Sequence, residues 1–203
     1  MEGFQYRFEP GTDPALPPLL LLHGTGGDEH DLIPLGREVA PGAALLSPRG
    51  RVLEHGMPRF FRRLAEGVFD EDDLRAQAAA LAGFVAAARE QHGLAAPVAL
   101  GFSNGANIAA ALLLLHPGTL AGAALLRAMP PLRQPPEVAL PGTPVLMLSG
   151  QADPIIPPQG SAALAATLEG AGAAVMHRSL PTGHGLTRTD LVLTREWLEN
   201  GLK

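Results

Sequence analysis

Ser103 is the residue whose surroundings most clearly suggest chemistry. It is the centre of Gly101-Phe102-Ser103-Asn104-Gly105, which has the form G-x-S-x-G. An apolar run at 97–100 precedes it and small residues at 104–115 follow, which predicts a strand, a tight turn and a helix. Such a turn needs small residues two places before and after the serine, because the chain passes close to itself there. The pattern arises easily by chance in a chain with 24 glycines, but this context favours a serine nucleophile for acyl transfer.

A serine hydroxyl also needs a general base, and the base needs an acid that fixes its tautomer. On a strand-to-helix elbow these partners follow the serine in the order acid, then histidine. Asp153 lies in the turn after the apolar run 144–148, at the sheet edge where sites of α/β folds gather. Turn capping is its alternative role, and Asp190 and Glu169 are rival acids within predicted helices. We predict that Asp153 is the catalytic acid.

Seven histidines compete for the role of base. His184 lies in Thr182-Gly183-His184-Gly185, a glycine-flanked loop between the last predicted strand and the last predicted helix. Other histidines are in or at the ends of predicted elements (His92, His116 and His177) or on loops upstream of Ser103 (His30 and His55). Chain order and loop placement therefore predict His184 as the base.

Two preorganised N–H donors must stabilise the negative oxygen of a tetrahedral intermediate. One is expected to be the backbone N–H of Asn104, directly after the nucleophile. The other is expected in the glycine-rich loop 23–28, after the apolar run 19–22, where Thr25 is the best-placed donor. We predict that Thr25 and Asn104 form the oxyanion hole.

The same loop has two other interpretations. A phosphate-binding loop is not supported, because no G-K-[ST] follows. Asp28, His30 and Asp31 have the side chains of metal ligands but not a recognised ligand spacing. Capping of the next helix explains Asp28 or Asp31 more simply, so neither a metal nor another cofactor is predicted.

Strand and helix patterns alternate along the chain. Strands are expected at 19–22, 43–46, 97–100, 120–126, 144–148 and 173–178, and helices at 31–40, 70–92, 104–115, 161–171 and 189–202. This alternation predicts a mostly parallel sheet with helices on both faces. The stretch 50–69 lacks periodicity and is expected to be irregular, and an edge strand at 4–8 is left open. No repeat or linker divides the chain, so one domain over 1–203 is expected.

Composition and charge limit the classes of partner that the protein is expected to bind. With 203 residues, 46% of them hydrophobic and 17% charged, the chain is expected to be globular rather than disordered. The net charge of −5 is spread out, which argues against nucleic acid and anionic membranes as partners. There is no cysteine, no signal-peptide pattern and no apolar run of about 20 residues, so a cytoplasmic location is expected.

These motifs together resemble the phospholipase/carboxylesterase family of α/β-hydrolases. The resemblance rests on residues 23–28, 101–105, 150–153 and 183–185, and it covers the chain from about Leu19 to the end. Residues 49–64 and 103–109 are most similar to a small bacterial branch associated with resistance to hydroquinones and related electrophiles. The resemblance implies the α/β-hydrolase fold with a minimal lid and a cofactor-free esterase, often a homodimer.

The irregular stretch 50–69 supplies the expected wall of the substrate pocket. Candidate substrate-binding residues are Met57, Arg59, Phe60, Phe61, Met129 and Ile155. The apolar side chains would provide contact area, and Arg59 or its neighbours Arg62 and Arg63 would meet an acidic or polar group. The alternative is that Phe60 and Phe61 anchor the stretch to the core while the arginines face water.

The predicted function is a serine carboxylesterase that hydrolyses small esters or lactones through an acyl-enzyme intermediate. Asn104 after the serine and the arginine-rich stretch argue against the long-chain lipid substrates of lysophospholipase relatives. A thioesterase or lysophospholipase with the same three residues is the alternative enzyme. A ligand-sensing scaffold that retains the three residues is the alternative outside catalysis.

Overall fold

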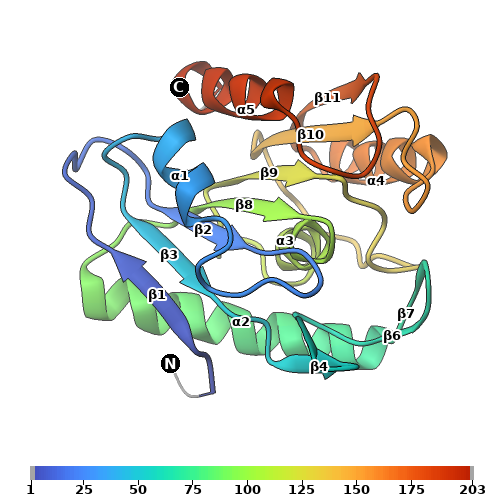
Figure 1. Cartoon of the computed structure of the whole chain (residues 1–203), viewed down its shortest axis with the longest axis horizontal. Helices are drawn as coiled ribbons and strands as arrows, with labels where there is room; N and C mark the ends of the chain where they lie inside the picture. Colours follow the sequence, from blue (N-terminus) through green and yellow to red (C-terminus); the bar gives the residue numbers. More distant parts are fainter. Residues whose placement is uncertain (1–2, 202–203) are drawn as a thin grey trace.

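A seven-stranded sheet crosses the molecule, whose computed structural model describes residues 3–201 (Figure 1). The strands lie in the spatial order β1 (Tyr6–Glu9), β3 (Leu45–Pro48), β2 (Leu19–Leu22), β8 (Val98–Phe102), β9 (Gly122–Leu126), β10 (Pro144–Gly150) and β11 (Ala174–Leu180). All neighbouring pairs are parallel except β1 with β3. The segment left open in the sequence therefore adds an antiparallel edge strand.

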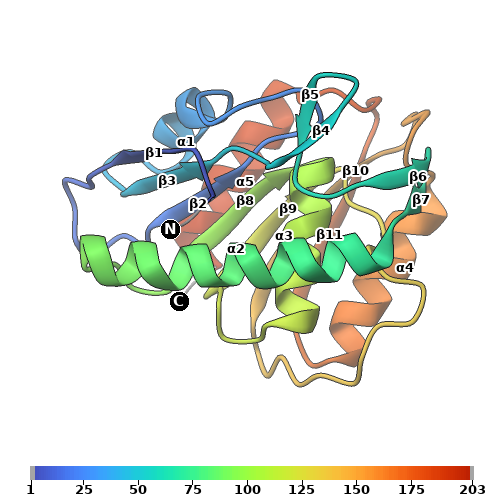
Figure 2. The same ribbon diagram turned by 90° about the horizontal axis from the view of Figure 1, so that it is seen from below.

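In the part of the chain that the structure describes, five helices cover the two faces of this sheet. Helices α1 (Ile33–Val39) and α5 (Arg188–Asn200) lie together on one face (Figure 1). Helices α2 (Glu71–His92), α3 (Asn104–Leu115) and α4 (Pro158–Gly170) cover the other face, as the view from below shows (Figure 2). No helix within residues 3–201 combines the length and the apolar character needed to cross a membrane.

The central strands are buried on both faces, which explains their unbroken apolar sequence. Leu20 and Leu22 of β2 join the core beneath α2, α3 and α4, whereas Leu19 and Leu21 join the core beneath α1 and α5. Helix α3 is made of small and apolar residues because it packs against β8, β9 and α2. The expected α/β fold, with a mostly parallel sheet and helices on both faces, is confirmed.

The ends of the longest helix follow from local signals. The side chain of Asp70 caps α2 by accepting the backbone N–H of Asp73, and three acidic residues occupy the first turn. Gly93 ends the helix in the left-handed conformation, with φ of 64°. Helix α5 was expected at 189–202, and Leu202 lies outside the described residues.

The stretch 50–69 is more ordered than the sequence suggests. It folds as two antiparallel hairpins, β4 (Val52–Glu54) with β5 (Met57–Arg59), and β6 (Arg63–Ala65) with β7 (Val68–Phe69). His55 and Gly56 both have positive φ, as a two-residue hairpin turn of type I′ requires. The expectation of an irregular stretch was therefore wrong, because strands this short leave no readable period.

Candidate active site

Ser103 occupies a strained turn between β8 and α3. Its φ and ψ are 53° and −115°, a combination that costs a non-glycine residue about 1–3 kcal/mol. Backbone hydrogen bonds hold the turn: Ser103 N donates to Leu126 O at 2.9 Å, and Asn107 N donates to Ser103 O at 2.9 Å. The fold thus maintains a serine in a conformation that it would not adopt by itself.

The two glycines of the motif are required by close packing. A Cβ on Gly101 would lie 2.6 Å from Gly105 O, and a Cβ on Gly105 would overlap the carbonyl of Leu22. Helix α3 can therefore start against the ends of β8 and β2 only if both positions lack a side chain. This confirms the steric reason for the G-x-S-x-G spacing.

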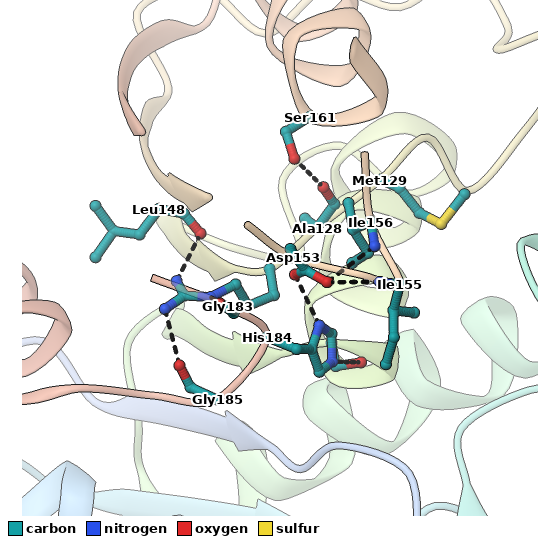
Figure 3. Close-up of polar contacts among 12 residues, drawn as sticks. Ala128, Met129, Leu148, Asp153, Ile155, Ile156, Ser161, Gly183, His184 and Gly185 are labelled. Carbon is teal, nitrogen blue, oxygen red and sulfur yellow. Dashed lines mark hydrogen bonds and ion pairs between the residues drawn. The ribbon is translucent and has the colours of Figure 1, made fainter. Parts of the chain in front are cut away.

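The structure brings the three predicted catalytic residues together at the carboxyl ends of the parallel strands. Nε2 of His184 lies 3.0 Å from Ser103 Oγ, and Nδ1 of His184 lies 2.8 Å from Asp153 Oδ2. Figure 3 shows the carboxylate of Asp153 directed at the His184 ring. With its proton on Nδ1, His184 has Nε2 free to accept the serine proton.

The surroundings of Asp153 keep it ionised. Its Oδ1 atom accepts the backbone N–H groups of Ile155 at 2.8 Å and Ile156 at 3.0 Å (Figure 3). Burial raises the pKa of Asp153, but these hydrogen bonds and the one to His184 outweigh it, so the pKa lies below its usual value. The Asp153 side chain is 1% exposed. Among the described residues, His184 is the one ionisable side chain that lowers its pKa.

Thr25 and Asn104 both line the cavity in front of Ser103. Within residues 3–201, the backbone N–H of neither residue donates to another protein group. The side chain of Asn104 has a different role from its backbone N–H: its Oδ1 accepts the backbone N–H of Phe60 at 2.7 Å. The two backbone donors are thus available for a ligand oxygen.

The cavity has a volume of about 290 Å³. Of the predicted substrate-binding residues, Arg59, Met129 and Ile155 line it. The others need correction: Phe60 and Phe61 are buried in the core, and Met57 is 40% exposed beside Gly26 without lining the cavity. The phenylalanines anchor the hairpins by packing on His23 and Phe69.

Arg59 and Arg63 line the cavity, and both pair with the carboxylate of Glu54 beside it. Arg63 Nε donates to Glu54 Oε1 at 2.9 Å, and Arg59 Nη1 lies 3.3 Å from Glu54 Oε2. Burial lowers the pKa of Arg59, and the hydrogen bond from Arg63 lowers the pKa of Glu54. One carboxylate is therefore shared by two guanidinium groups, and Glu66 adds a second carboxylate to the lining of the cavity.

Asp28, at the end of the glycine-rich loop, makes a local backbone contact. Asp28 Oδ1 accepts the backbone N–H of His30, which is a turn contact. Among residues 3–201, no set of three or more His, Cys, Asp or Glu side chains is placed to hold a metal ion.

Several site residues were not predicted. Glu54, Glu66, Phe69 and Asn107 lie in or beside the cavity wall because the hairpins and α3 fold over it. Arg127 was also missed, although its position directly after the apolar run 120–126 is unusual for a charged residue. Such a residue at the end of a central strand is a signal for a buried charge.

A Ser-His-Asp arrangement on a strand-to-helix elbow, above a mostly parallel sheet with helices on both faces, defines an α/β-hydrolase. A family model described as TAP-like protein (Abhydrolase_4) matches residues 126–193, the part that carries Asp153 and His184.

Known proteins match the chain over nearly its whole length. The Bacillus subtilis (strain 168) protein named "Putative hydrolase MhqD" is 44% identical over 202 residues, which are 98% of this chain and 99% of that protein. The crystal structure of the Bacillus cereus carboxylesterase is 44% identical, with a TM-score of 0.95, and the match covers 98% of this chain and 94% of that one. A structure of YahD with malic acid is 31% identical, with a TM-score of 0.91 and coverage of 97% and 98%.

The chain therefore belongs to the phospholipase/carboxylesterase family of α/β-hydrolases, in the bacterial branch of MhqD. Membership of this family makes it an enzyme of the hydrolase class.

Proposed function

We propose that this protein is a serine carboxylesterase that hydrolyses small carboxylic esters through an acyl-enzyme intermediate. The observation that carries the proposal is the continuous hydrogen-bond chain from Ser103 Oγ through His184 to Asp153, at 3.0 and 2.8 Å. Ser103 and His184 line a cavity that a substrate can enter, and Asp153 is buried behind them.

In the acylation step, His184 Nε2 takes the proton of Ser103 Oγ as that oxygen attacks the ester carbonyl. Asp153 stays ionised and stabilises the imidazolium that forms. The backbone N–H groups of Thr25 and Asn104 stabilise the oxyanion. His184 then gives its proton to the departing alcohol.

Deacylation repeats these roles with water as the nucleophile. His184 removes a proton from the water, the new tetrahedral intermediate collapses, and Ser103 Oγ leaves and recovers its proton. The carboxylic acid product departs, and no cofactor is consumed.

The size and lining of the cavity favour a substrate with a small acyl group. A volume of about 290 Å³ is at the low end for ligand pockets. Met129, Ile155 and Phe69 offer apolar contacts, whereas Arg59, Arg63 and Glu66 add charged groups. The relative YahD has a structure with malic acid, a small carboxylic acid, which supports a substrate that carries a carboxylate of its own.

The deciding experiment compares steady-state hydrolysis of p-nitrophenyl acetate, butyrate and palmitate by the wild type and Ser103→Ala. We expect turnover of the two short esters, weak turnover of palmitate, and background rates for Ser103→Ala. Ser179→Ala is the matched control, because Ser179 is exposed on β11 and does not line the cavity.

A preference for palmitate would contradict the small substrate and favour a lysophospholipase. Equal activity of the wild type and Ser103→Ala would contradict the nucleophile. Retention of a stoichiometric acyl group without turnover would favour the ligand-sensing scaffold.

A further inference from the structure

Arg127 is a completely buried arginine next to the proposed base loop. It directly follows β9, is 0% exposed and has a φ of 60°. Its backbone N–H donates to Leu148 O at 2.8 Å. The preceding residue, Leu126, accepts the backbone N–H of Ser103. Arg127 is therefore the direct neighbour in sequence of Leu126, the residue whose carbonyl holds the backbone of the nucleophile.

The guanidinium uses all five of its N–H donors. Nε donates to Gly183 O at 3.1 Å, and Nη2 donates to Gly185 O at 3.0 Å. Nη1 donates to Leu148 O at 3.2 Å, and Nη1 and Nη2 form a two-point pair with Asp190 at 2.7 and 2.9 Å. Figure 3 shows the carbonyl groups of Leu148 and Gly185 engaged in this network.

Gly183 and Gly185 are the two neighbours of His184 in the chain. Glycine leaves the backbone free to adopt many conformations, so a base between two glycines needs an external support. Arg127 supplies it by holding the carbonyl on each side of His184. It also holds Leu148, in the strand that leads to Asp153.

Asp190, which the sequence offered as an alternative catalytic acid, caps helix α5 instead. Its Oδ2 atom accepts the N–H and the hydroxyl of Thr187, at 2.7 and 2.8 Å, as a cap for α5. Its charge compensates Arg127, since an unpaired charge would be costly at this depth. The pair thus joins the base loop, the start of α5 and the ends of β9 and β10.

Stability alone is a poor reason for this arrangement. An apolar pair of similar volume often stabilises a core as well as a buried ion pair does. What an apolar pair cannot supply is directed hydrogen bonds to the carbonyls on both sides of the base. A rotation of the loop would change the distance between His184 Nε2 and Ser103 Oγ, on which proton transfer depends.

We propose that Arg127, paired with Asp190, is a positioning residue that holds His184 in line with Ser103 and so sets the rate of the chemical step without touching the substrate. This inference rests on the proposed esterase function for its kinetic consequence. Its structural consequence, the placement of the His184 ring, is measurable without turnover.

The test uses two variants and a control in the same part of the chain. Arg127→Met with Asp190→Asn removes both charges together, so no unpaired charge stays buried. Arg127→Lys keeps a cation near Asp190, but its single ammonium group cannot reach both glycine carbonyls in the geometry of the guanidinium fork. Arg188→Met is the control, because Arg188 is 80% exposed and pairs on the surface with Glu38.

For the double variant we expect a folded protein by circular dichroism, a 10- to 100-fold lower kcat on p-nitrophenyl butyrate and a KM within about twofold of the wild type. Arg127→Lys should fold and lose about tenfold in kcat. The proton NMR signal of His184 Nδ1–H, assigned by its absence in His184→Gln, should shift or broaden in both. Arg188→Met should change neither kcat nor this signal.

A wild-type kcat and an unchanged Nδ1–H signal in folded Arg127→Lys and in the double variant would overturn the proposal, while the esterase function would stand. If the double variant does not fold, Arg127→Lys decides by the same two measurements. If Ser103→Ala hydrolyses esters as fast as the wild type, Ser103 is not the nucleophile and the proposed serine mechanism fails, and the NMR signal alone tests the positioning role.

Discussion

Nη1 of Arg59 donates a hydrogen bond of 2.6 Å to Oγ1 of Thr25. The residues on each side of Arg59 make related contacts: Pro58 O accepts the N–H of Gly26 at 2.9 Å, and the N–H of Phe60 donates to Asn104 Oδ1. Three consecutive residues at the end of the β4–β5 hairpin therefore hold both residues of the proposed oxyanion hole. The hairpin supports the geometry of the hole as well as forming part of the cavity wall.

Replacement of Thr25 by valine tests this support, because valine keeps the shape and the backbone N–H but loses the acceptor. We expect an approximately tenfold lower kcat, equivalent to about 1.4 kcal/mol of transition-state stabilisation, with little change in KM. Steady-state kinetics on p-nitrophenyl butyrate measures it. Thr25→Ser keeps the hydroxyl and should retain most of the activity. Wild-type kcat in Thr25→Val would show that the contact is irrelevant to catalysis.

Asp153→Asn should abolish most activity through the tautomer of His184. The amide oxygen of asparagine would take over the N–H groups of Ile155 and Ile156, which turns its NH₂ toward His184 Nδ1. The proton of His184 then moves to Nε2, which can no longer accept the proton of Ser103. A loss of about 10³ to 10⁴ in kcat is expected.

The control for this change is Glu169→Gln, which alters the exposed rival carboxylate and should leave kcat unchanged. Circular dichroism of Asp153→Asn should match the wild type, because the two backbone contacts of Oδ1 are preserved. A kcat within tenfold of the wild type would rule out Asp153 as the orienting acid.

Because of His23, the free energy of unfolding should be lower in mild acid than at neutral pH. It is buried, its Nε2 accepts the N–H of Gly50 at 2.9 Å, and its Nδ1 lies 2.6 Å from Gly24 O, so the ring is neutral. Burial lowers the pKa of His23 below the usual 6.5. The unfolded chain thus binds a proton that the folded chain resists between the lowered pKa and about 6.5, and stability falls as pH drops through that window.

Urea unfolding at pH 7.5 and 5.5 measures this effect. The wild type should lose up to about 1.4 kcal/mol of unfolding free energy per pH unit from this one group. His177, whose pKa burial also lowers, should add to the loss. His23→Asn should be less stable at pH 7.5 and should show a smaller decrease toward pH 5.5. An equal decrease in both proteins would exclude His23 as a source.

Arg63 should favour esters whose acyl chain ends in a carboxylate. Its side chain is 30% exposed, lines the cavity and shares Glu54 with Arg59. We expect Arg63→Met to lower kcat/KM about tenfold for the p-nitrophenyl monoester of succinic acid and to leave the butyrate ester within about twofold. A change of equal size for both esters would indicate a role in folding rather than in recognition.

Arg62→Met is the matched control for that substitution. Arg62 is the adjacent arginine, is 62% exposed and pairs with Asp70 away from the cavity. Its removal should affect neither ester.

The sequence by itself determined the elbow that carries Ser103 and its two partners, Asp153 and His184. Gly101 and Gly105 mark a local steric requirement, and the carboxyl ends of parallel strands must meet at one edge, which places Ser103, Asp153 and His184 together from chain order alone. Local pattern and sheet topology therefore carry enough information for this part. The predicted homodimer and cytoplasmic location stay predictions.

Only the tertiary structure decided the pocket wall and the supports of the site. Phe60 and Phe61 looked equally suited to bind substrate or to fill the core, and their burial follows from the packing of the two hairpins. The partner of Arg127 lies 63 residues further along the chain, and no local pattern links the two. Contacts between distant segments depend on how the elements pack, which periodicity within each element does not encode.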